Sequence, residues 1–199
     1  MTMQNHSRVY DTYSQAERAV RDLEKAGVPA ADISVIANKH VTADNPRATE
    51  SSPTATGAGV GAVVGGGAGL LAGLGLLAIP GLGPVVAVGW LATTALGAVA
   101  GSATGGIIGA LVGAGVSETH AHVYSEAVRR GGTLVTVRSE QPGDAIERIL
   151  DGYQPIDADR RGDEYRGEGW KQFDPAAPAY KPMQTDAERR SRSQNNAPL

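Results

Sequence analysis

The chain of 199 residues contains no cysteine, one phenylalanine and two tryptophans. Without cysteine it has no disulfide, no thiolate zinc site and no cysteine nucleophile. So few aromatic rings argue against a platform on which nucleic-acid bases stack. The formal net charge is −3, so no general electrostatic attraction draws the chain to nucleic acid. We therefore expect no nucleic-acid partner.

Charge is missing from one long segment, because no Asp, Glu, Lys or Arg occurs between Ser51 and Ser117. In this segment glycine recurs at every fourth position in two runs, one on each side of Pro80-Gly81-Leu82-Gly83-Pro84. Positions four apart share one face of a helix, so each run predicts a helix with a face free of side chains. The glycines on these two predicted packing faces are Gly57, Gly61, Gly65, Gly69 and Gly73, and then Gly97, Gly101, Gly105, Gly109 and Gly113.

The two runs together predict an apolar glycine-zipper helical hairpin over residues 57–116. Its turn at 80–84 is formed by Pro80, Gly81, Gly83 and Pro84. Glycine faces let helix backbones approach closely, which is how many transmembrane helices pack. A helix from residue 57 to residue 79 would extend about 35 Å, and the apolar core of a bilayer is about 30 Å thick. Three interpretations stay open: packed membrane helices, a helical hairpin buried in a soluble oligomer, and low-complexity sequence with little fixed structure.

The charged segment before this block predicts a β-α-β unit over residues 7–38. Arg8-Val9-Tyr10 is typical of a short strand, and Ile33–Ala37 of a second strand because of its β-branched residues. Between them, Ser14-Gln15-Ala16-Glu17 matches a capping box, and Gly27 with Pro29 ends the helix. Residues 39–56, rich in Thr, Ser, Asp, Asn and Pro, are expected to be a linker.

The charged segment after the block, residues 117–160, predicts a capped helix and a second β-α-β unit. The expected elements, in order, are a helix, a strand, a helix and a short strand at Glu118–Arg130, Thr133–Arg138, Pro142–Tyr153 and Ile156–Ala158. Two β-α-β units in one sheet predict the α+β class, as a ferredoxin-like split β-α-β sandwich with the hairpin inserted between its halves. The polar residues 161–199 are expected to be a disordered tail.

Metal-ligating and catalytic patterns are weak. His120 and His122 are two residues apart and point to different sides of a helix, and His122 shares a face only with Glu118. Gly65-Gly66-Gly67 lacks the following Lys-Ser or Lys-Thr of a phosphate-binding loop. We therefore expect no enzyme, no catalytic residue, no metal, no cofactor and no small-molecule substrate.

Two motifs carry a family resemblance. They are Ala78-Ile79-Pro80-Gly81-Leu82-Gly83-Pro84-Val85 and Val128-Arg129-Arg130-Gly131-Gly132-Thr133-Leu134-Val135. With Val9-Tyr10 and Ala26-Gly27-Val28, they make the chain from Arg8 to Arg161 resemble a bacterial family of general stress proteins. This family comprises the heat-induced stress protein YflT-like, or low-temperature-induced, proteins. The resemblance implies a stress-associated, non-enzymatic protein and supplies no catalytic residue.

These observations predict a stress-associated, non-enzymatic protein that associates with a membrane. We expect membrane lipid and further copies of the chain as partners. The polar residues 1–13 predict no cleavable secretory signal, and basic residues flank the block while its turn has none. The expected location is therefore the cell inner membrane with both termini in the cytoplasm. The alternative is a cytoplasmic, soluble homo-oligomer that buries the hairpins at its centre.

Overall fold

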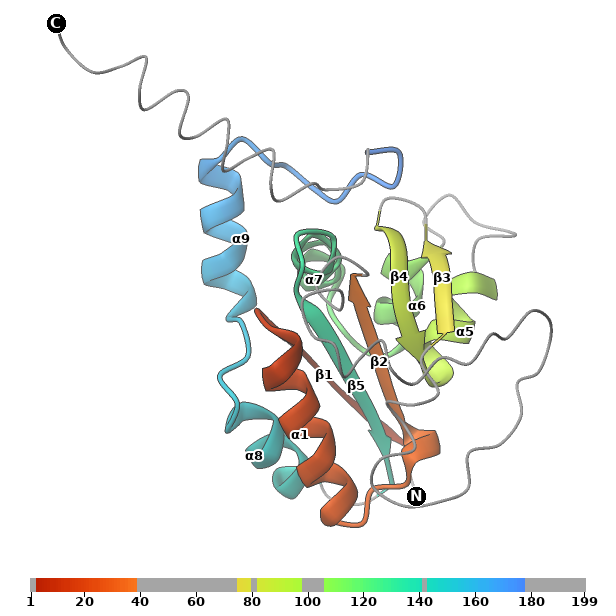
Figure 1. Cartoon of the computed structure of the whole chain (residues 1–199). Coiled ribbons are helices and arrows are strands. Elements are labelled where there is room, and N and C mark those ends of the chain that lie inside the picture. The colour runs from red at the N-terminus through yellow and green to blue at the C-terminus, as the bar shows by residue number, and fades with distance from the viewer. Residues whose placement is uncertain (1–2, 39–74, 80–81, 98–105, 141–142, 178–199) are drawn as a thin grey trace, which may run out of the picture.

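The computed structural model describes residues 3–38, 75–79, 82–97, 106–140 and 143–177, and these form an α+β fold (Figure 1). An antiparallel sheet packs against helices, so the predicted α+β class is confirmed. The elements in chain order are β1 (Gln4–Tyr10), α1 (Tyr13–Lys25), the 3-10 helix η1 (Ala30–Asp32), β2 (Ile33–Asn38), β3 (Gly75–Ile79), β4 (Gly83–Val88), α5 (Trp90–Gly97), α6 (Ile107–Gly113), α7 (Glu118–Arg129), β5 (Thr133–Ser139), α8 (Asp144–Asp151) and α9 (Ala158–Gly167).

The strand order is β1-β5-β2-β4-β3, and every neighbouring pair is antiparallel. Leu134 at the middle of β5 pairs with Val9 on one side and with Ile36 on the other. Strands β1 and β2, which α1 connects, therefore lie on either side of β5. Strands β1, β5, β2 and β4 form the main sheet, and β3 extends it at the edge.

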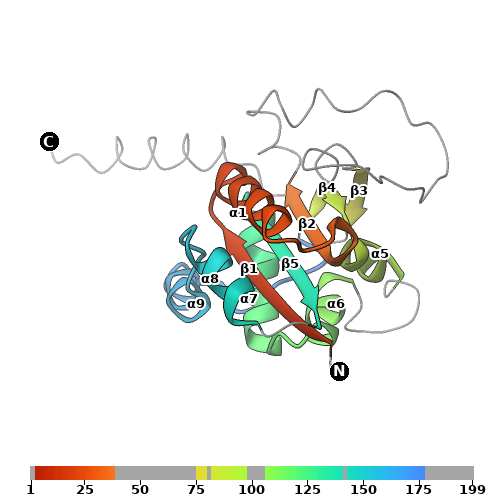
Figure 2. The same cartoon turned by 90° about the horizontal axis from the view of Figure 1, so that it is seen from below.

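Helices cover both faces of this sheet. Alternate residues of a strand point to opposite faces, and Val9 packs in one apolar cluster while Tyr10 packs in the other. The Tyr10 cluster lies under α1 and α8, and the Tyr10 hydroxyl donates a hydrogen bond of 2.8 Å to the Leu150 carbonyl. The Val9 cluster lies under α5, α6 and α7. Figure 2 shows the sheet between α1 on one side and α6 and α7 on the other.

Local caps define the two longest helices. Helix α7 begins after Ser117, whose hydroxyl accepts a hydrogen bond from the His120 N–H, so the predicted cap is confirmed. Helix α1 instead begins after Thr12, which forms a capping box with Gln15. The predicted cap at Ser14 is therefore wrong by two residues. The earlier start buries Tyr13 against Ala37 of β2.

The Pro-Gly-rich turn lies where it was predicted, but it joins two strands. The Leu82 N–H donates to the Ile79 carbonyl at 3.0 Å, and Ile79 is paired with Gly83. Residues 75–79 and 83–88 are strands, so the prediction of helical arms does not hold there. Antiparallel pairing with β4 satisfies the backbone groups of β2 on the side away from β5.

The end of the domain also differs from the prediction. The expected last strand at Ile156 is reduced to one hydrogen bond, from the Ile156 N–H to the Val9 carbonyl at 2.8 Å. Asp157 then caps α9 by accepting from the Arg160 N–H. The expectation of a disordered tail from residue 161 is wrong as far as residue 177, because Tyr165 and Phe173 are buried. Residues 178–199 lie outside the described part.

Candidate functional site

The described half of the uncharged segment packs as a layer of the domain. Leu91 of α5 and Ile107 and Leu111 of α6 are buried, in the same cluster as Val9, Ile36 and Leu134 of the sheet. The segment contributes β4 to the sheet and α5 and α6 to the helices on it, and the chain then continues into α7 at Glu118. The second arm of the predicted hairpin is thus divided here between a strand and two short helices.

The structure describes some of the glycines predicted to form packing faces, and these lie in different elements. Gly57, Gly61, Gly65, Gly69, Gly73, Gly101 and Gly105, together with Pro80 and Gly81, lie outside the described residues. Gly83 and Pro84 belong to β4, and Gly97 is the last residue of α5. Gly109 lies within α6, and Gly113 ends it, where a methyl group added to its Cα would have no atom within 4 Å. Among the described residues, none therefore makes a close helix contact with Gly113.

The end of α6 exposes apolar surface. Val112 is 44% exposed and is one of two large hydrophobic side chains exposed among the described residues. Gly113 and Gly115 beside it are exposed as well. We call Val112, Gly113 and Gly115 the α6 tip. It is the described part of the uncharged segment that is most open to a partner or a lipid surface.

A buried ion cluster joins α7 to the C-terminal segment. The Glu126 carboxylate is 1% exposed and accepts hydrogen bonds of 2.6 Å from both Arg129 and Arg130. Arg130 also pairs with Glu168 at 2.5 Å and lies 4.1 Å from the centre of the Tyr165 ring. Burial alone would lower the pKa of Arg130, but its hydrogen bonds to Glu168 and Glu126 outweigh burial and raise that pKa. The cluster consists of mutually neutralised charges and serves to hold α9 on α7.

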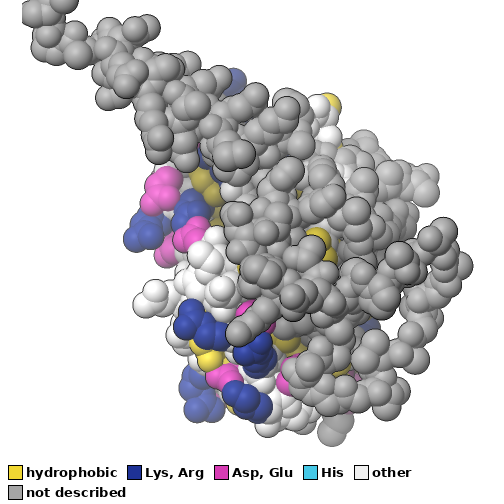
Figure 3. All heavy atoms as spheres, in the orientation of Figure 1, with side chains coloured by type: hydrophobic (Ala, Val, Ile, Leu, Met, Phe, Trp, Pro, Cys, Tyr) yellow, Lys and Arg dark blue, Asp and Glu magenta, His cyan; other side chains and the backbone are white. Residues whose placement is uncertain are grey.

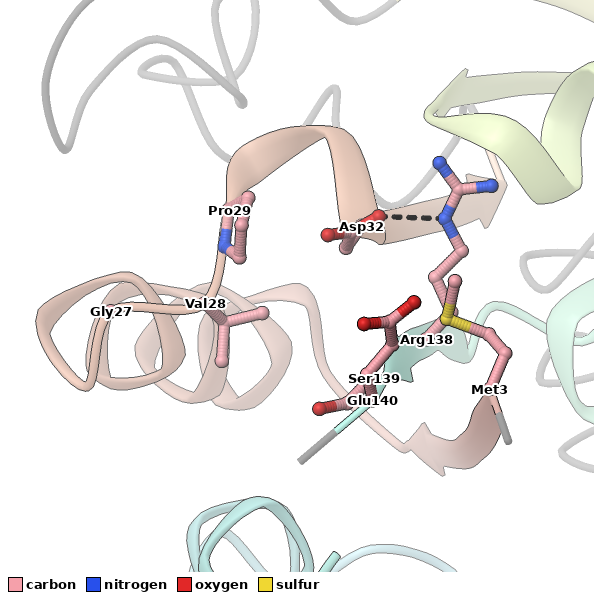
Figure 4. A pocket seen from close by; sticks show the side chains of 8 residues that line it. All are labelled: Met3, Gly27, Val28, Pro29, Asp32, Arg138, Ser139 and Glu140. Atoms are coloured by element: carbon pink, nitrogen blue, oxygen red, sulfur yellow. Dashed lines mark hydrogen bonds and ion pairs between the residues drawn. The ribbon is translucent and has the colours of Figure 1, made fainter. Parts of the chain in front are cut away.

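One cavity lies where η1 meets the end of β5 (Figure 4). Its volume is about 300 Å³, and it is lined by Met3, Gly27, Val28, Pro29, Asp32, Arg138, Ser139 and Glu140. The Arg138 Nε donates to the Asp32 carboxylate at 2.7 Å, and the guanidinium lies 5.6 Å from the centre of the Trp90 ring. Because these contacts occupy the Arg138 side chain, it ties η1 to β5 and α5.

A second cavity lies between the start of α7 and the segment that follows α9. We call it the α7–α9 cavity. Its volume is about 290 Å³, and its lining residues are Glu118, Thr119, His122, Arg166, Trp170, Lys171 and Gln172. The Nδ1 atom of His122 and the Nε1 atom of Trp170 are buried and have no hydrogen-bond partner in the described part of the chain. This site was not predicted, because the polar composition of residues 161–199 indicated a disordered tail. The aromatic residues Tyr165, Trp170 and Phe173 were the feature that indicated order.

The two histidines of α7 contact different groups. The His120 Nε2 atom lies 3.0 Å from an Asp159 carboxylate oxygen, whereas His122 lines the α7–α9 cavity. Within the described ranges, no group of three His, Asp or Glu side chains is arranged to hold a metal ion. Of the same residues, no helix is both long enough and apolar enough to span a bilayer.

The three comparisons with known proteins agree in their outcome. No family model, no curated protein and no solved structure matches this chain.

Proposed function

We propose that this chain is a stress-associated, non-enzymatic protein that associates with the inner membrane through its uncharged glycine-rich segment, with a cytoplasmic domain built on a ferredoxin-like plan. The observation that carries the proposal is the absence of charge from Ser51 to Ser117 together with the two four-residue glycine repeats. The family resemblance of the flanking motifs supports the association with stress. Lipid and further copies of the chain are the partners that this surface chemistry suits.

The distribution of charge in the domain supports the same proposal. Helices α1, α8 and α9 carry Lys, Arg, Asp and Glu side chains on their outer surfaces, as Figure 3 shows at its left side. The uncharged segment supplies β4 within the sheet and α5 and α6 on the face opposite α1 and α8, and α6 ends in the α6 tip. A domain whose charged helices α1 and α8 lie on one face and whose exposed α6 tip lies on the other suits an orientation with this tip toward a membrane.

Fractionation of tagged protein before and after stress tests the proposal. The wild-type chain should remain with membranes after a carbonate wash. Leu70→Lys with Leu71→Lys should release it, because a lysine costs about 2.5 to 3.5 kcal/mol at the centre of a membrane helix. Ala43→Lys with Thr49→Lys adds the same charge before the uncharged segment and should leave the protein bound. Recovery of all wild-type protein in the soluble fraction as a monodisperse species would contradict the proposal.

A second candidate function is a soluble homo-oligomer with the glycine-rich segments at its core. The burial of Leu91, Ile107 and Leu111 within the domain favours a soluble form, and the exposed α6 tip is the described surface of the segment that is open to a second copy. Size-exclusion chromatography without detergent separates the two candidates, since a defined oligomer supports the second and detergent dependence supports the first. Because the chain has no native cysteine, cross-linking between single introduced cysteines can report contacts between segments.

A matched pair of variants tests the glycine repeats for either candidate. Gly65→Leu with Gly105→Leu should reduce cross-linking between the two arms, since leucine holds closely packed backbones apart. Ala72→Leu lies off the repeat and should leave cross-linking unchanged. Equal cross-linking in the two variants would show that the glycines are composition and not a contact surface.

A further inference from the structure

The α7–α9 cavity is built by two parts of the chain that are far apart in sequence. Helix α7 supplies Glu118, Thr119 and His122, and the segment from Arg166 to Gln172 supplies the rest. The backbone N–H of Trp170 donates to the Tyr165 carbonyl at 3.0 Å. The Trp170 indole packs edge-on against the Tyr165 ring, with 5.6 Å between ring centres and 70° between planes. The indole is therefore held in a fixed orientation at the cavity wall.

Two ring nitrogens at this cavity lack an acceptor. Trp170 Nε1 is always a hydrogen-bond donor, and His122 Nδ1 is a donor in one of its tautomers. Neither atom has a partner among the described residues, and both are buried. Leaving such a group unpaired costs roughly 1 to 3 kcal/mol, so buried polar groups normally have a partner. Two unpaired nitrogens, from two separate elements lining one cavity, indicate a ligand that carries acceptor oxygens.

Most of the other side chains that line the cavity are also hydrogen-bond donors. Lys171 is exposed and cationic, and Thr119 and Gln172 can each donate a hydrogen bond. Arg166 donates to Asp163 at 2.8 Å, which offsets its charge. Glu118 is the one carboxylate in the lining, and its exposed side chain can turn toward solvent. Donors therefore outnumber acceptors around the cavity.

We propose that the α7–α9 cavity binds a phosphoryl group. A phosphoryl group presents three strong acceptor oxygens, which match Trp170 Nε1, His122 Nδ1 and Lys171 Nζ. Both nitrogens are buried, so binding requires the exposed lining side chains of Glu118, Lys171 and Gln172 to move and open the way to them. The inference does not require the proposed membrane function, because free phosphate carries the same oxygens.

The position of the cavity defines the two sources to be distinguished. Helix α7 begins directly after Ser117, where the uncharged segment ends, and the α6 tip precedes it. The α7 residues that would bind a lipid phosphate follow the apolar α6 tip within a few positions of the sequence, and such a tip suits contact with acyl chains. Free inorganic phosphate needs no such surface.

Calorimetric titration of the full chain with inorganic phosphate, and separately with vesicles, tests the proposal. The vesicles are neutral phosphatidylcholine with or without phosphatidic acid, and sodium chloride at equal ionic strength is the control. Saturable binding of phosphate identifies the free ion as a ligand. Binding of phosphatidic acid vesicles alone identifies the lipid headgroup. In Trp90→Phe, Trp170 is the one remaining tryptophan, so its fluorescence should change on binding.

Conservative variants identify the atoms involved. Trp170→Phe keeps the ring and removes the N–H, and should weaken binding about tenfold, as expected for a hydrogen bond to a charged group. His122→Gln removes the donor at the Nδ1 position and should weaken binding similarly, whereas His122→Asn keeps a donor near that position and should bind more tightly than the Gln variant. Circular dichroism shows whether each variant is folded. Absence of binding to phosphate and to phosphatidic acid would overturn the proposal, as would wild-type affinity in folded Trp170→Phe.

Discussion

The two faces of the sheet are covered in different ways. Helix α1 follows β1 directly, is capped by its own Thr12-Gln15 pair, and turns Arg21 and Lys25 toward solvent. The opposite face is covered by α5 and α6, which carry no charge, and by α7, to which the C-terminal segment is clamped by Arg130–Glu168. The first face is covered by amphipathic helices whose outer sides are charged and exposed, whereas the second is covered by uncharged helices and by a C-terminal segment held through a buried ion cluster. Substitutions on the second face should therefore have the larger effects.

The largest effect is expected at Glu126. Its carboxylate is buried between Arg129 and Arg130, so Glu126→Ala removes the buried acceptor that both partly buried guanidinium groups share. Breaking a buried pair in this way costs about 3 to 5 kcal/mol of unfolding free energy. On the other face, Glu17→Ala removes the pair with the half-exposed Arg21 and should cost about 0.3 to 0.5 kcal/mol. Urea denaturation measures the unfolding free energy of both variants. Similar losses in the two would contradict the expectation that the second face is the more sensitive one.

Gly89 tests whether the uncharged segment is folded as described. Gly89 has φ +94°, and a methyl group there would lie 2.5 Å from the Ile33 carbonyl oxygen and 2.6 Å from the Ser34 Cα. Gly89→Ala should destabilise the domain by roughly 3 kcal/mol, from left-handed strain and from the backbone shift.

Gly27 is the matched control for this variant. It has φ +89° with no atom within 4 Å of the methyl position, so Gly27→Ala should cost only the strain, about 1 to 2 kcal/mol. Thermal unfolding measures both variants. A stabilising effect of Gly89→Ala would instead indicate a continuous helix at that position, because alanine exceeds glycine in helix propensity by about 1 kcal/mol.

Phe173 tests the docking of the C-terminal segment. Its ring is 3% exposed and packs in the Val9 cluster, so Phe173→Ala should release residues 158–177 at a cost of about 3 kcal/mol. Hydrogen exchange and limited proteolysis should show the loss in this segment, while α1 and α8 stay protected. Phe173→Leu keeps apolar volume and should stay docked. If protection in the Ala variant equals wild type, the docking does not depend on this ring.

A substitution at Gly113 should have a small effect on stability, and it should stabilise the domain where the preceding substitutions destabilise it. It lies at the end of α6 in open space, so Gly113→Ala should stabilise the isolated domain by about 0.5 kcal/mol. If Gly113 is instead a contact between chains, the same variant should weaken self-association. Sedimentation at several protein concentrations distinguishes the two results.

The smallest effect concerns Asp22 on the α1 face. Hydrogen bonds from Lys25 and then from Tyr153 lower the pKa of Asp22 below its ordinary value of 3.8. A lowered pKa stabilises the fold above that ordinary value, and the contribution is lost as the pH falls through the lowered pKa. An NMR titration should therefore show a higher Asp22 pKa in Lys25→Met, and a smaller rise in Tyr153→Phe. An unchanged pKa in both variants would contradict these causes.

Sequence patterns predicted the charged half of the molecule well because its determinants are local. The Ser117 cap of α7 and the β-branched run of β5 each lie within a few residues of the element they define. The start of α1 was misplaced because Thr12–Gln15 and Ser14–Glu17 both match a capping box. Burial of Tyr13 against β2 accompanies the start at Thr12, and that contact is not visible in a local motif.

The candidate sites were less predictable from sequence. The glycine repeats indicated helix packing, yet residues 75–79 and 83–88 form strands that extend the sheet beyond β2. The α7–α9 cavity joins residues 118–122 to residues 166–172, and no periodic pattern connects segments so far apart. Only the aromatic residues in a polar stretch indicated that this part of the chain is ordered.

By itself, the sequence determined the α+β class, the reversal of the chain near residues 80–84, and the separation of charged from uncharged segments. These features follow from backbone preferences and side-chain periodicity, which act over a few residues. Only the tertiary structure decided that β3 and β4 join the sheet and that the segment after Asp157 docks on α7. Both depend on partners distant in the sequence: the unpaired edge of β2 accepts β4, and the apolar cluster around Val9 and Leu134 accepts Phe173.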